Sequence, residues 1–458
     1  MTLEERLVQV RPSKRQLAHQ ELEFYAFVHF TVNTFTDKEW GDGTENPSIF
    51  NPTKLDTNQW AQAIKSAGMK GLILTCKHHD GFCLWPSKYT KHTVSTSLYK
   101  NGKGDVVAQA AASCKKYGLK FGVYLSPWDR NCPLYGQGQA YDDFFCNQLT
   151  ELLTNYGEVF SVWFDGACGE GPNGKKQIYD FERYYKVIRE LQPNACISVC
   201  GPDVRWCGNE AGYCREAEWS VVPLRTKDTE IIKENSQQSD SEEFRQRKIS
   251  AHDQDLGSRQ LLENEEELIW YPAEVNTSIR PGWFYHTYED DKVRSLEELV
   301  NIYINSVGGN ATFLLNIPPT PEGLFHKNDV ERLSELGEYL RKNLGTPFYS
   351  QTNPVPEISS TNNTFVFSFD DDNANTTENN ISRAVKYIVI MEDISQSQRV
   401  EKYTVEAKIN NKLEHLYEGT VIGYKKIIKL GKPVKATEIQ LTILQSRCNP
   451  ILSFIGFY

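Results

Sequence analysis

The segment VFSVWFDG, residues 159–166, decides the fold of this chain. It is apolar except for one serine until it reaches Asp165, and it lacks the alternation of polar and apolar residues typical of a half-exposed strand. Such runs indicate strands covered on both faces, as in a parallel sheet. A buried carboxylate is costly unless it is paired or used. We therefore expect Asp165 to be either a turn-capping residue or part of the floor of a site.

Similar apolar runs recur along the first three quarters of the chain, and amphipathic helical patterns separate them. A strand followed by a helix, repeated about eight times, predicts an α/β fold with a (β/α)8-like barrel. The other expected strands are 24–31, 71–76, 120–126, 195–201, 217–222, 268–275 and 311–318, and the clearest early helices are 105–117, 139–156 and 178–191.

The pattern changes near Gly345. Two helices precede this point, one with Leu296, Leu299, Val300, Tyr303 and Val307 on one face, and one with Val330, Leu333, Leu336, Leu340 and Leu344. Short runs of alternating polarity follow, separated by turn residues, and they predict a C-terminal antiparallel β-sandwich. We expect a catalytic barrel domain over 1–346 and a β-sandwich domain over 347–458.

Residues 224–267 are strongly charged and too long for an ordinary connection between a strand and a helix. We interpret them as an insertion with some helix of its own. A solvated surface loop is the favoured reading, and a part in substrate recognition is the alternative.

Composition excludes several functional classes. The 458 residues carry a formal net charge of −10, and no dense basic stripe offsets it, which disfavours nucleic acid as a partner. No window approaches eighteen uninterrupted apolar residues, so no membrane span is expected. The first sixteen residues are too charged for a signal peptide, which leaves the compartment open: cytoplasmic, or periplasmic or secreted if a leader was removed. The oligomeric state is likewise left open.

The 11 cysteines are scattered and include no Cys-x-x-Cys pair, so a zinc site is not favoured over ordinary buried thiols.

Polar and aromatic residues gather where the predicted strands end. In a (β/α)8 barrel these positions share one rim, where reactive groups sit. The rim candidates are His29, Lys77, His78, His79, Asp80, Tyr124, Trp128, Asp165, Arg205, Trp206 and Glu210.

Two chemistries suit this rim. The first is metal-assisted hydrolysis with His29, His78, His79 and Asp165 as ligands. Neighbouring side chains on a strand point to opposite faces, so both adjacent histidines reach one ion only if the backbone has left the strand there. The second is glycoside hydrolysis by a pair of carboxyl groups, with aromatic rings against the sugar. The Trp and Tyr residues near the strand ends favour the second.

Four segments carry a family resemblance, in order and with compatible spacing between about residues 10 and 345. They are HFTVNTFTDKEWGDGTENPSIFNPTKLDTNQW (29–60), GLILTCKHHDGFCLWPSKYTKHTV (71–94), VWFDGACGE (162–170) and GPDVRWCGNEAG (201–212). KHHDGF and EWGDG are quite specific. The chain resembles the α-L-fucosidases of glycoside hydrolase family 29, and is most similar to the branch that cuts α-1,3 and α-1,4 linked fucose from branched glycans.

This resemblance implies a retaining exo-α-L-fucosidase that forms a covalent fucosyl-enzyme intermediate and needs no cofactor or metal. Asp165 matches the nucleophile and Glu210 the acid/base, with Glu216 as the reserve candidate. The implied partner is a fucosylated oligosaccharide or glycoconjugate. A catalytically silent fucose-binding lectin on the same scaffold is the alternative from another class. The substrate-binding positions implied are His29, Glu39, Trp40, His78, His79, Tyr124, Trp163, Arg205 and Trp283, the last packed against the C6 methyl group.

The sandwich resembles the second domain of the same family, and its ending resembles a galactose-binding-type module. A packing role is favoured over sugar binding.

Overall fold

The structure is a computed structural model that describes residues 2–247, 255–356, 363–369 and 382–458. Strand β4 (Ser161–Phe164) is buried along its whole length and pairs in parallel with β3 (Lys120–Leu125) and β5 (Cys196–Val199). The apolar run that ends on Asp165 is therefore a buried strand of a parallel sheet, as its pattern predicts.

Eight parallel strands form the central sheet, in the order β5-β4-β3-β2-β1-β10-β9-β6. Its two end strands approach each other, because Ser198 bridges Val204 in parallel and Val199 N donates to Val204 O at 3.0 Å. The sheet is thus a nearly closed barrel, and the predicted fold class is confirmed. The remaining strands are β1 Phe24–Val28, β2 Gly71–Lys77, β6 Arg205–Trp206, β9 Ala273–Ser278 and β10 Ala311–Asn316.

The expected strand at 217–222 is wrong as a barrel strand. Its end forms β7 (Val221–Pro223), which pairs antiparallel with β8 (Leu268–Trp270) in a separate ribbon. The run predicted at 268–275 is accordingly split between β8 and β9. The short β6, which follows β5 along the chain, pairs with β9 and takes the barrel position that was expected for 217–222. Apolar periodicity did not separate these segments because both are buried.

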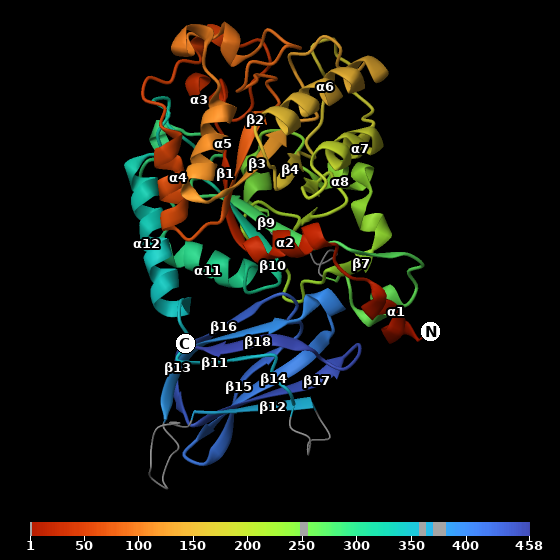
Figure 1. Cartoon of the computed structure of the whole chain (residues 1–458), viewed down its shortest axis with the longest axis vertical. Helices are drawn as coiled ribbons and strands as arrows, with labels where there is room; N and C mark the ends of the chain where they lie inside the picture. Colours follow the sequence, from red (N-terminus) through yellow and green to blue (C-terminus); the bar gives the residue numbers. More distant parts are fainter. Residues whose placement is uncertain (1, 248–254, 357–362, 370–381) are drawn as a thin grey trace.

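Helices surround the barrel sheet (Figure 1). Helix α5 shows how the ends are set: Asp105 caps it by accepting from Ala108 N at 2.8 Å, and Gly118 ends it at φ +69°, a conformation that glycine adopts without strain. The helices are α1 Leu3–Gln9, α2 Lys14–Leu22, α3 Asn33–Thr36, α4 Thr57–Ser66, α5 Val106–Tyr117, α6 Gln139–Asn155, α7 Phe181–Leu191, α8 Thr229–Asn235, α9 Glu242–Gln246, α10 Arg259–Leu262, α11 Leu296–Ser306 and α12 Lys327–Leu344. The short 3-10 helices are η1 Pro47–Ile49, η2 Val94–Thr96, η3 Tyr99–Gly102, η4 Leu224–Lys227, η6 Thr287–Glu289 and η7 Ile394–Gln396.

The chain then enters two four-stranded antiparallel sheets, ordered β11-β18-β13-β16 and β12-β17-β14-β15. They enclose a second apolar core, which confirms the predicted sandwich. The division at residues 346 and 347 stays a prediction. The strands are β11 Tyr349–Thr352, β12 Asn363–Ser368, β13 Arg383–Glu392, β14 Val400–Ile409, β15 Lys412–Gly419, β16 Lys426–Ala436, β17 Glu438–Ser446 and β18 Leu452–Phe457.

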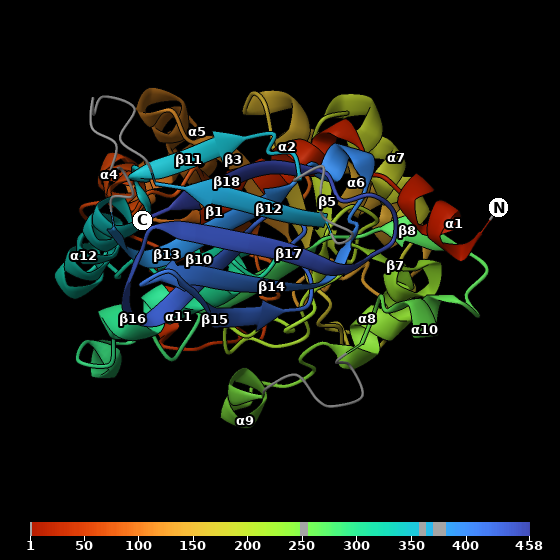
Figure 2. The same cartoon turned by 90° about the horizontal axis from the view of Figure 1, so that it is seen from below.

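The sandwich adjoins the barrel: it lies directly below the barrel in Figure 1 and in front of it in the view from below (Figure 2). Tyr387, Val389 and Ile427 of the sandwich belong to the same buried apolar cluster as the barrel core. The two units therefore share a core at their junction. Within the described residues, none of the helices combines the length and the apolar character that a membrane span requires.

Candidate active site

A cavity of about 580 Å³, counted to its solvent-open mouth, lies where the barrel strands end. Seven of the predicted site residues line it together with both predicted catalytic carboxyl groups. The lining residues predicted from the sequence are His29, Glu39, Trp40, His78, His79, Trp163, Asp165, Glu210 and Trp283. Residues from six segments far apart in the chain thus meet at one site.

Asp165 follows the last residue of β4, and its side chain is 23% exposed. Tyr124 Oη donates to its Oδ2 at 2.9 Å, and the backbone N–H of Ala167 donates to its Oδ1 at 2.8 Å. Burial raises the pKa of Asp165, and these two hydrogen bonds oppose that rise. The carboxylate is therefore held at the cavity wall in a fixed orientation.

Glu210 lies in the loop after β6 and accepts a 3.2 Å hydrogen bond on Oε2 from Trp283 Nε1. Burial raises the pKa of Glu210 to about 8, and the negative charge of Asp165 adds to the rise, while the Trp283 bond opposes it. An indole N–H can only donate. Oε2 is therefore the acceptor oxygen, and the proton of the neutral acid belongs on Oε1.

His78 and His79 lie just beyond β2, which ends at Lys77. Because the backbone has left the strand, both adjacent rings face the cavity, with centroids 4.1 Å apart. His78 stacks on Tyr124 with ring centroids 5.7 Å apart. This is the local geometry that two neighbouring histidines need to serve one ligand.

The hydrogen bonds around His29 and His79 fix their tautomers. Ser126 Oγ donates to the carbonyl of Trp128 at 2.7 Å, so it accepts the 2.7 Å bond from His79 Nδ1. The Asn316 amide N donates to Trp283 O and Ser278 Oγ, so its Oδ1 accepts from His29 Nδ1 at 2.8 Å. Both rings carry the proton on Nδ1 and leave Nε2 as an acceptor.

Burial lowers the pKa of His29 and of His79 to about 3, and that of His78 well below the usual range. These rings are neutral at physiological pH. One ligand atom from each of His78, His79 and Asp165 lies within 4.8 Å of the others, so these three residues could hold a metal ion.

Glu39 fixes the loop that carries Trp283. Its carboxylate accepts from the backbone N–H groups of Trp283 at 2.9 Å and Phe284 at 3.0 Å, and contacts His286 Nε2 at 2.8 Å. Burial disfavours charge on His286, but its hydrogen bonds to Glu39 and Asp37 outweigh this and raise its pKa to about 9. Glu39 thus lines the cavity and also anchors the ring that contacts Glu210.

The other predicted residues are placed as follows. The Trp40 ring meets His79 edge-on, with centroids 5.2 Å apart, and Trp163 donates from Nε1 to Glu274 at 2.8 Å. Tyr124 donates a hydrogen bond to Asp165 but is not part of the cavity lining. Arg205 is buried away from the cavity, where its guanidinium binds Glu218 and the carbonyls of Tyr271 and Trp219.

Glu216, the reserve acid/base candidate, is exposed and does not line the cavity. Its carbonyl accepts from Thr420 Oγ of the sandwich at 3.3 Å.

Several lining residues were not among the predicted catalytic and substrate-binding positions: Phe27, Gly166, Ala167, Val199, Trp206, Ser236, Gln237 and Asn276. Trp206 stands among the rim candidates, but nothing in the sequence distinguished it from a packing residue. Val199 has φ +66°, a strained conformation for a β-branched residue. Apolar patterning does not reveal such backbone strain.

Ser236 and Gln237 come from the charged insertion, so the expectation of a purely solvated loop is wrong for its first part. The Gln237 side chain is buried at 7% exposure, and its amide nitrogen has no partner among the described residues. Residues 248–254 of the insertion lie outside the described ranges.

Comparison with known proteins decides the family. The family model described as alpha-L-fucosidase matches residues 14–344. The chain belongs to the α-L-fucosidase family. It is 38% identical to Alpha-L-fucosidase 1 of Arabidopsis thaliana over 98% of this chain and 87% of that protein.

Two solved structures agree with this assignment. A glycoside hydrolase family 29 member from an unknown rumen bacterium is 40% identical, covers 98% of this chain and 77% of its own, and superposes with a TM-score of 0.82. A Ruminococcus gnavus family 29 fucosidase, a mutant in complex with fucose, is 30% identical over 98% and 94% of the two chains, with a TM-score of 0.78. This α-L-fucosidase is therefore a glycoside hydrolase, and its family implies a fucosylated glycan as substrate.

Proposed function

We propose that this α-L-fucosidase removes terminal α-1,3 or α-1,4 linked L-fucose from branched oligosaccharides with retention of configuration. The proposal rests on the observation that Asp165 and Glu210 line one cavity in contrasting environments. Asp165 accepts two hydrogen bonds that favour its ionised form, while burial holds Glu210 protonated at neutral pH. Opposite protonation of two carboxyl groups is what a retaining glycosidase requires.

In the first step, an Asp165 carboxylate oxygen attacks the anomeric carbon of fucose and forms a covalent ester. The bond from that carbon to the glycosidic oxygen breaks, and Glu210 Oε1 gives its proton to the departing oxygen. In the second step, ionised Glu210 takes a proton from water, the water oxygen attacks the anomeric carbon, and Asp165 leaves. Net retention follows from two inversions. The carboxyl groups should stand roughly 5 to 5.5 Å apart, which stays a prediction.

The neutral histidines suit recognition of sugar hydroxyls. His29 and His79 offer Nε2 as an acceptor, so each can take the hydrogen of a hydroxyl group. We assign fucose binding to His29, His78, His79, Glu39 and Trp40, with Trp283 against the C6 methyl group. Phe27, Trp163 and Val199 line the cavity and belong to a buried apolar cluster, from which we infer that they close its base. A closed base favours exo action on a terminal sugar.

A second cavity of about 860 Å³ adjoins the first, and Glu210 and Trp283 line both. The departing oxygen must lie beside Glu210, so the rest of the glycan extends to this side. Room there supports an oligosaccharide aglycone over a small one. The lectin and metallohydrolase readings are not favoured.

The mechanism is tested by trapping and by product configuration. Incubation with a 2-deoxy-2-fluoro fucosyl donor that has a good leaving group should add the mass of one 2-deoxy-2-fluorofucosyl group to a peptide containing Asp165. NMR of the first product should show α-fucose before mutarotation. An initial β product would overturn retention, and a label on another residue would remove Asp165 from the nucleophile role.

Linkage is tested with a panel of α-1,2, α-1,3, α-1,4 and α-1,6 fucosides plus an aryl fucoside. We expect fucose release from the branched α-1,3 and α-1,4 members. Preference for the α-1,2 or α-1,6 member would refute the linkage proposal and leave the fucosidase assignment intact.

A further inference from the structure

We propose that Gln398 of the C-terminal sandwich is a positioning residue for the acid/base Glu210, so that the sandwich is part of the catalytic apparatus. This inference rests on the proposed role of Glu210. It gives the sandwich a defined function, transmitted through a buried chain of hydrogen bonds and ion pairs.

Gln398 follows η7 and is completely buried, with 0% exposure. Its Oε1 accepts from the backbone N–H of Ser220 at 2.8 Å, and its Nε2 donates to the carbonyl of Glu218 at 3.3 Å. One amide thus binds the backbone of the barrel segment 218–220 on both sides of Trp219. Buried backbone groups need such partners, so the contact determines where this segment lies.

Glu218 connects the segment that Gln398 contacts to the two arginines beside the Glu210 loop. It is completely buried, and its carboxylate binds the guanidinium of Arg205 and accepts from the backbone N–H of Arg215 at 3.1 Å. The two arginines lower the pKa of Glu218, although burial alone raises it, so the group is ionised. A buried ionised carboxylate between two guanidinium groups has few alternative positions.

Arg205 and Arg215 flank the Glu210 loop in the sequence. Arg215 Nη1 donates to the carbonyl of Cys207 at 3.0 Å, which joins the end of the loop to its beginning. Inside the loop, Asn209 Oδ1 accepts from the N–H groups of Ala211 and Tyr213 at 3.1 Å each. Glu210 therefore sits in a closed loop whose base is held by Glu218, and Glu218 is held from the sandwich.

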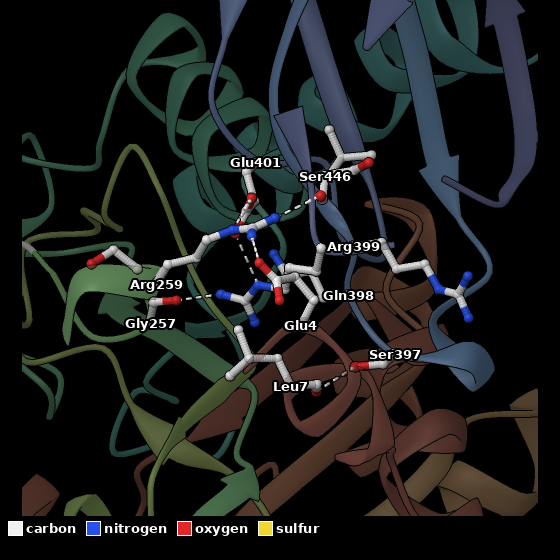
Figure 3. Close-up of polar contacts among 12 residues, drawn as sticks. Glu4, Leu7, Gly257, Arg259, Ser397, Gln398, Arg399, Glu401 and Ser446 are labelled. Carbon is white, nitrogen blue, oxygen red and sulfur yellow. Dashed lines mark hydrogen bonds and ion pairs between the residues drawn. The ribbon is translucent and has the colours of Figure 1, made fainter. Parts of the chain in front are cut away.

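The surrounding interface keeps Gln398 in place. Ser397 Oγ donates to the carbonyl of Leu7, and Arg259 contacts Glu401 and the carbonyl of Ser446 (Figure 3). Arg447 Nη2 also donates to the carbonyl of Gly257. These bonds join the sandwich to α1 and to the barrel segment around α10. Gln398 thus projects from an anchored edge, which makes it able to restrain the segment it contacts.

The test compares two substrates that differ in their need for an acid. An aryl fucoside with a strongly acidic phenol leaves without proton donation, whereas a sugar aglycone needs it. We expect Gln398→Ala to lower kcat/KM for a fucosylated trisaccharide about tenfold more than for the aryl fucoside, because general acid catalysis contributes about a hundredfold or more. The alkaline limb of the pH profile should shift as well. If Gln398 has a purely structural role, the substitution should lower kcat/KM for both substrates by the same factor.

Two further variants keep the test decisive if Gln398→Ala folds poorly. Gln398→Glu keeps an acceptor for Ser220 N–H but loses the donor to Glu218. Glu218→Gln keeps the shape but removes the charge that holds Arg205 and Arg215. Both should lower kcat/KM for the trisaccharide more than kcat/KM for the aryl fucoside, as Gln398→Ala should. Tyr339→Phe is the matched control, because it removes a 2.6 Å hydrogen bond to Tyr387 of the sandwich remote from Glu210. It should leave the ratio unchanged.

Glu210→Ala on the same substrates separates the two proposals. If Glu210→Ala lowers kcat/KM for the trisaccharide and for the aryl fucoside by the same factor, Glu210 is not the acid/base. The other result is that Glu210→Ala lowers kcat/KM for the trisaccharide more than for the aryl fucoside. If the Gln398 and Glu218 variants then leave the ratio of the two kcat/KM values as in the wild type, the positioning role is overturned. An equal shift in Tyr339→Phe would also overturn it, because any loosening of the domains would then suffice.

Discussion

The indole Nε1–H of Trp283 donates to Oε2 of Glu210 across 3.2 Å, linking a residue of the loop after β9 to one of the loop after β6. Trp283 is in turn fixed through its backbone N–H by Glu39, at 2.9 Å. The proposed acid/base is therefore oriented by the residue proposed to contact the C6 methyl group. Sugar recognition and proton transfer share one ring in this site.

The pH dependence should follow the two carboxyl groups. Glu210 must be protonated, so kcat/KM should fall as the pH rises through about 8. Asp165 must be ionised, and burial raises its pKa, so the acid limb should lie above the usual aspartate range near 3.9. Activity of the wild-type protein between pH 3 and 10 checks this. The aryl fucoside should lose the alkaline limb, and a limb of equal depth for both substrates would contradict the assignment.

Trp283→Phe should move that alkaline limb to higher pH. The indole bond lowers the pKa of Glu210, so its removal lets burial act with less opposition. Phe keeps an aromatic surface for the sugar, so we expect a loss in kcat/KM of about tenfold, on the order of 1.4 kcal/mol. The pH profile of the variant on a trisaccharide measures both effects. An unmoved limb would mean that the bond does not act on Glu210.

Glu39→Gln should loosen the loop that carries Trp283 and lower the pKa of His286, because Glu39 contributes to raising that pKa to about 9. Against an unfolded value near 6.5, the contribution of His286 to stability is fully present below about pH 6.5 and is lost as the pH rises through about 9. NMR titration of His286 measures the shift, and thermal unfolding at pH 6 and pH 10 measures the stability. His286→Asn is the companion variant, and stability that depends equally on pH in both variants and the wild type would exclude this coupling.

Gln237→Ala should raise KM for a branched trisaccharide and leave the simple aryl fucoside nearly unchanged. The amide nitrogen of Gln237 is buried at the cavity without a partner among the described residues, which suits a glycan hydroxyl. The loss of one neutral hydrogen bond corresponds to about 1 kcal/mol, or roughly fivefold in affinity. Gln238→Ala, one residue further along and more exposed, is the control. Equal effects on both substrates would place Gln237 at the fucose itself rather than at the aglycone.

Chelation tests the metal reading directly. His78, His79 and Asp165 could hold an ion, but the proposed mechanism uses these groups on the sugar. Dialysis against EDTA should leave kcat unchanged, and elemental analysis should find less than stoichiometric zinc. Loss of activity that zinc restores would favour the metallohydrolase alternative.

The sequence by itself determined the architecture of the barrel, because strands buried on both faces leave continuous apolar runs such as the one that ends on Asp165. It also placed Asp165 and the histidine pair on one rim, since strand ends share one rim in this fold, while the nucleophile role of Asp165 came only from the family resemblance. It did not identify β6, which is only two residues long. The prediction of 217–222 as a barrel strand was therefore wrong.

Only the tertiary structure decided which glutamate faces the cavity. Glu210, Glu216 and Glu218 lie within nine residues, yet one lines the cavity, one is exposed and one is buried between two arginines. The same holds for Arg205, which pairs with Glu218, and for Ser236 and Gln237, which come from a charged insertion. Burial and pairing depend on contacts between segments far apart in the chain, such as Gln398 with Ser220, and local residue patterns carry no record of those contacts.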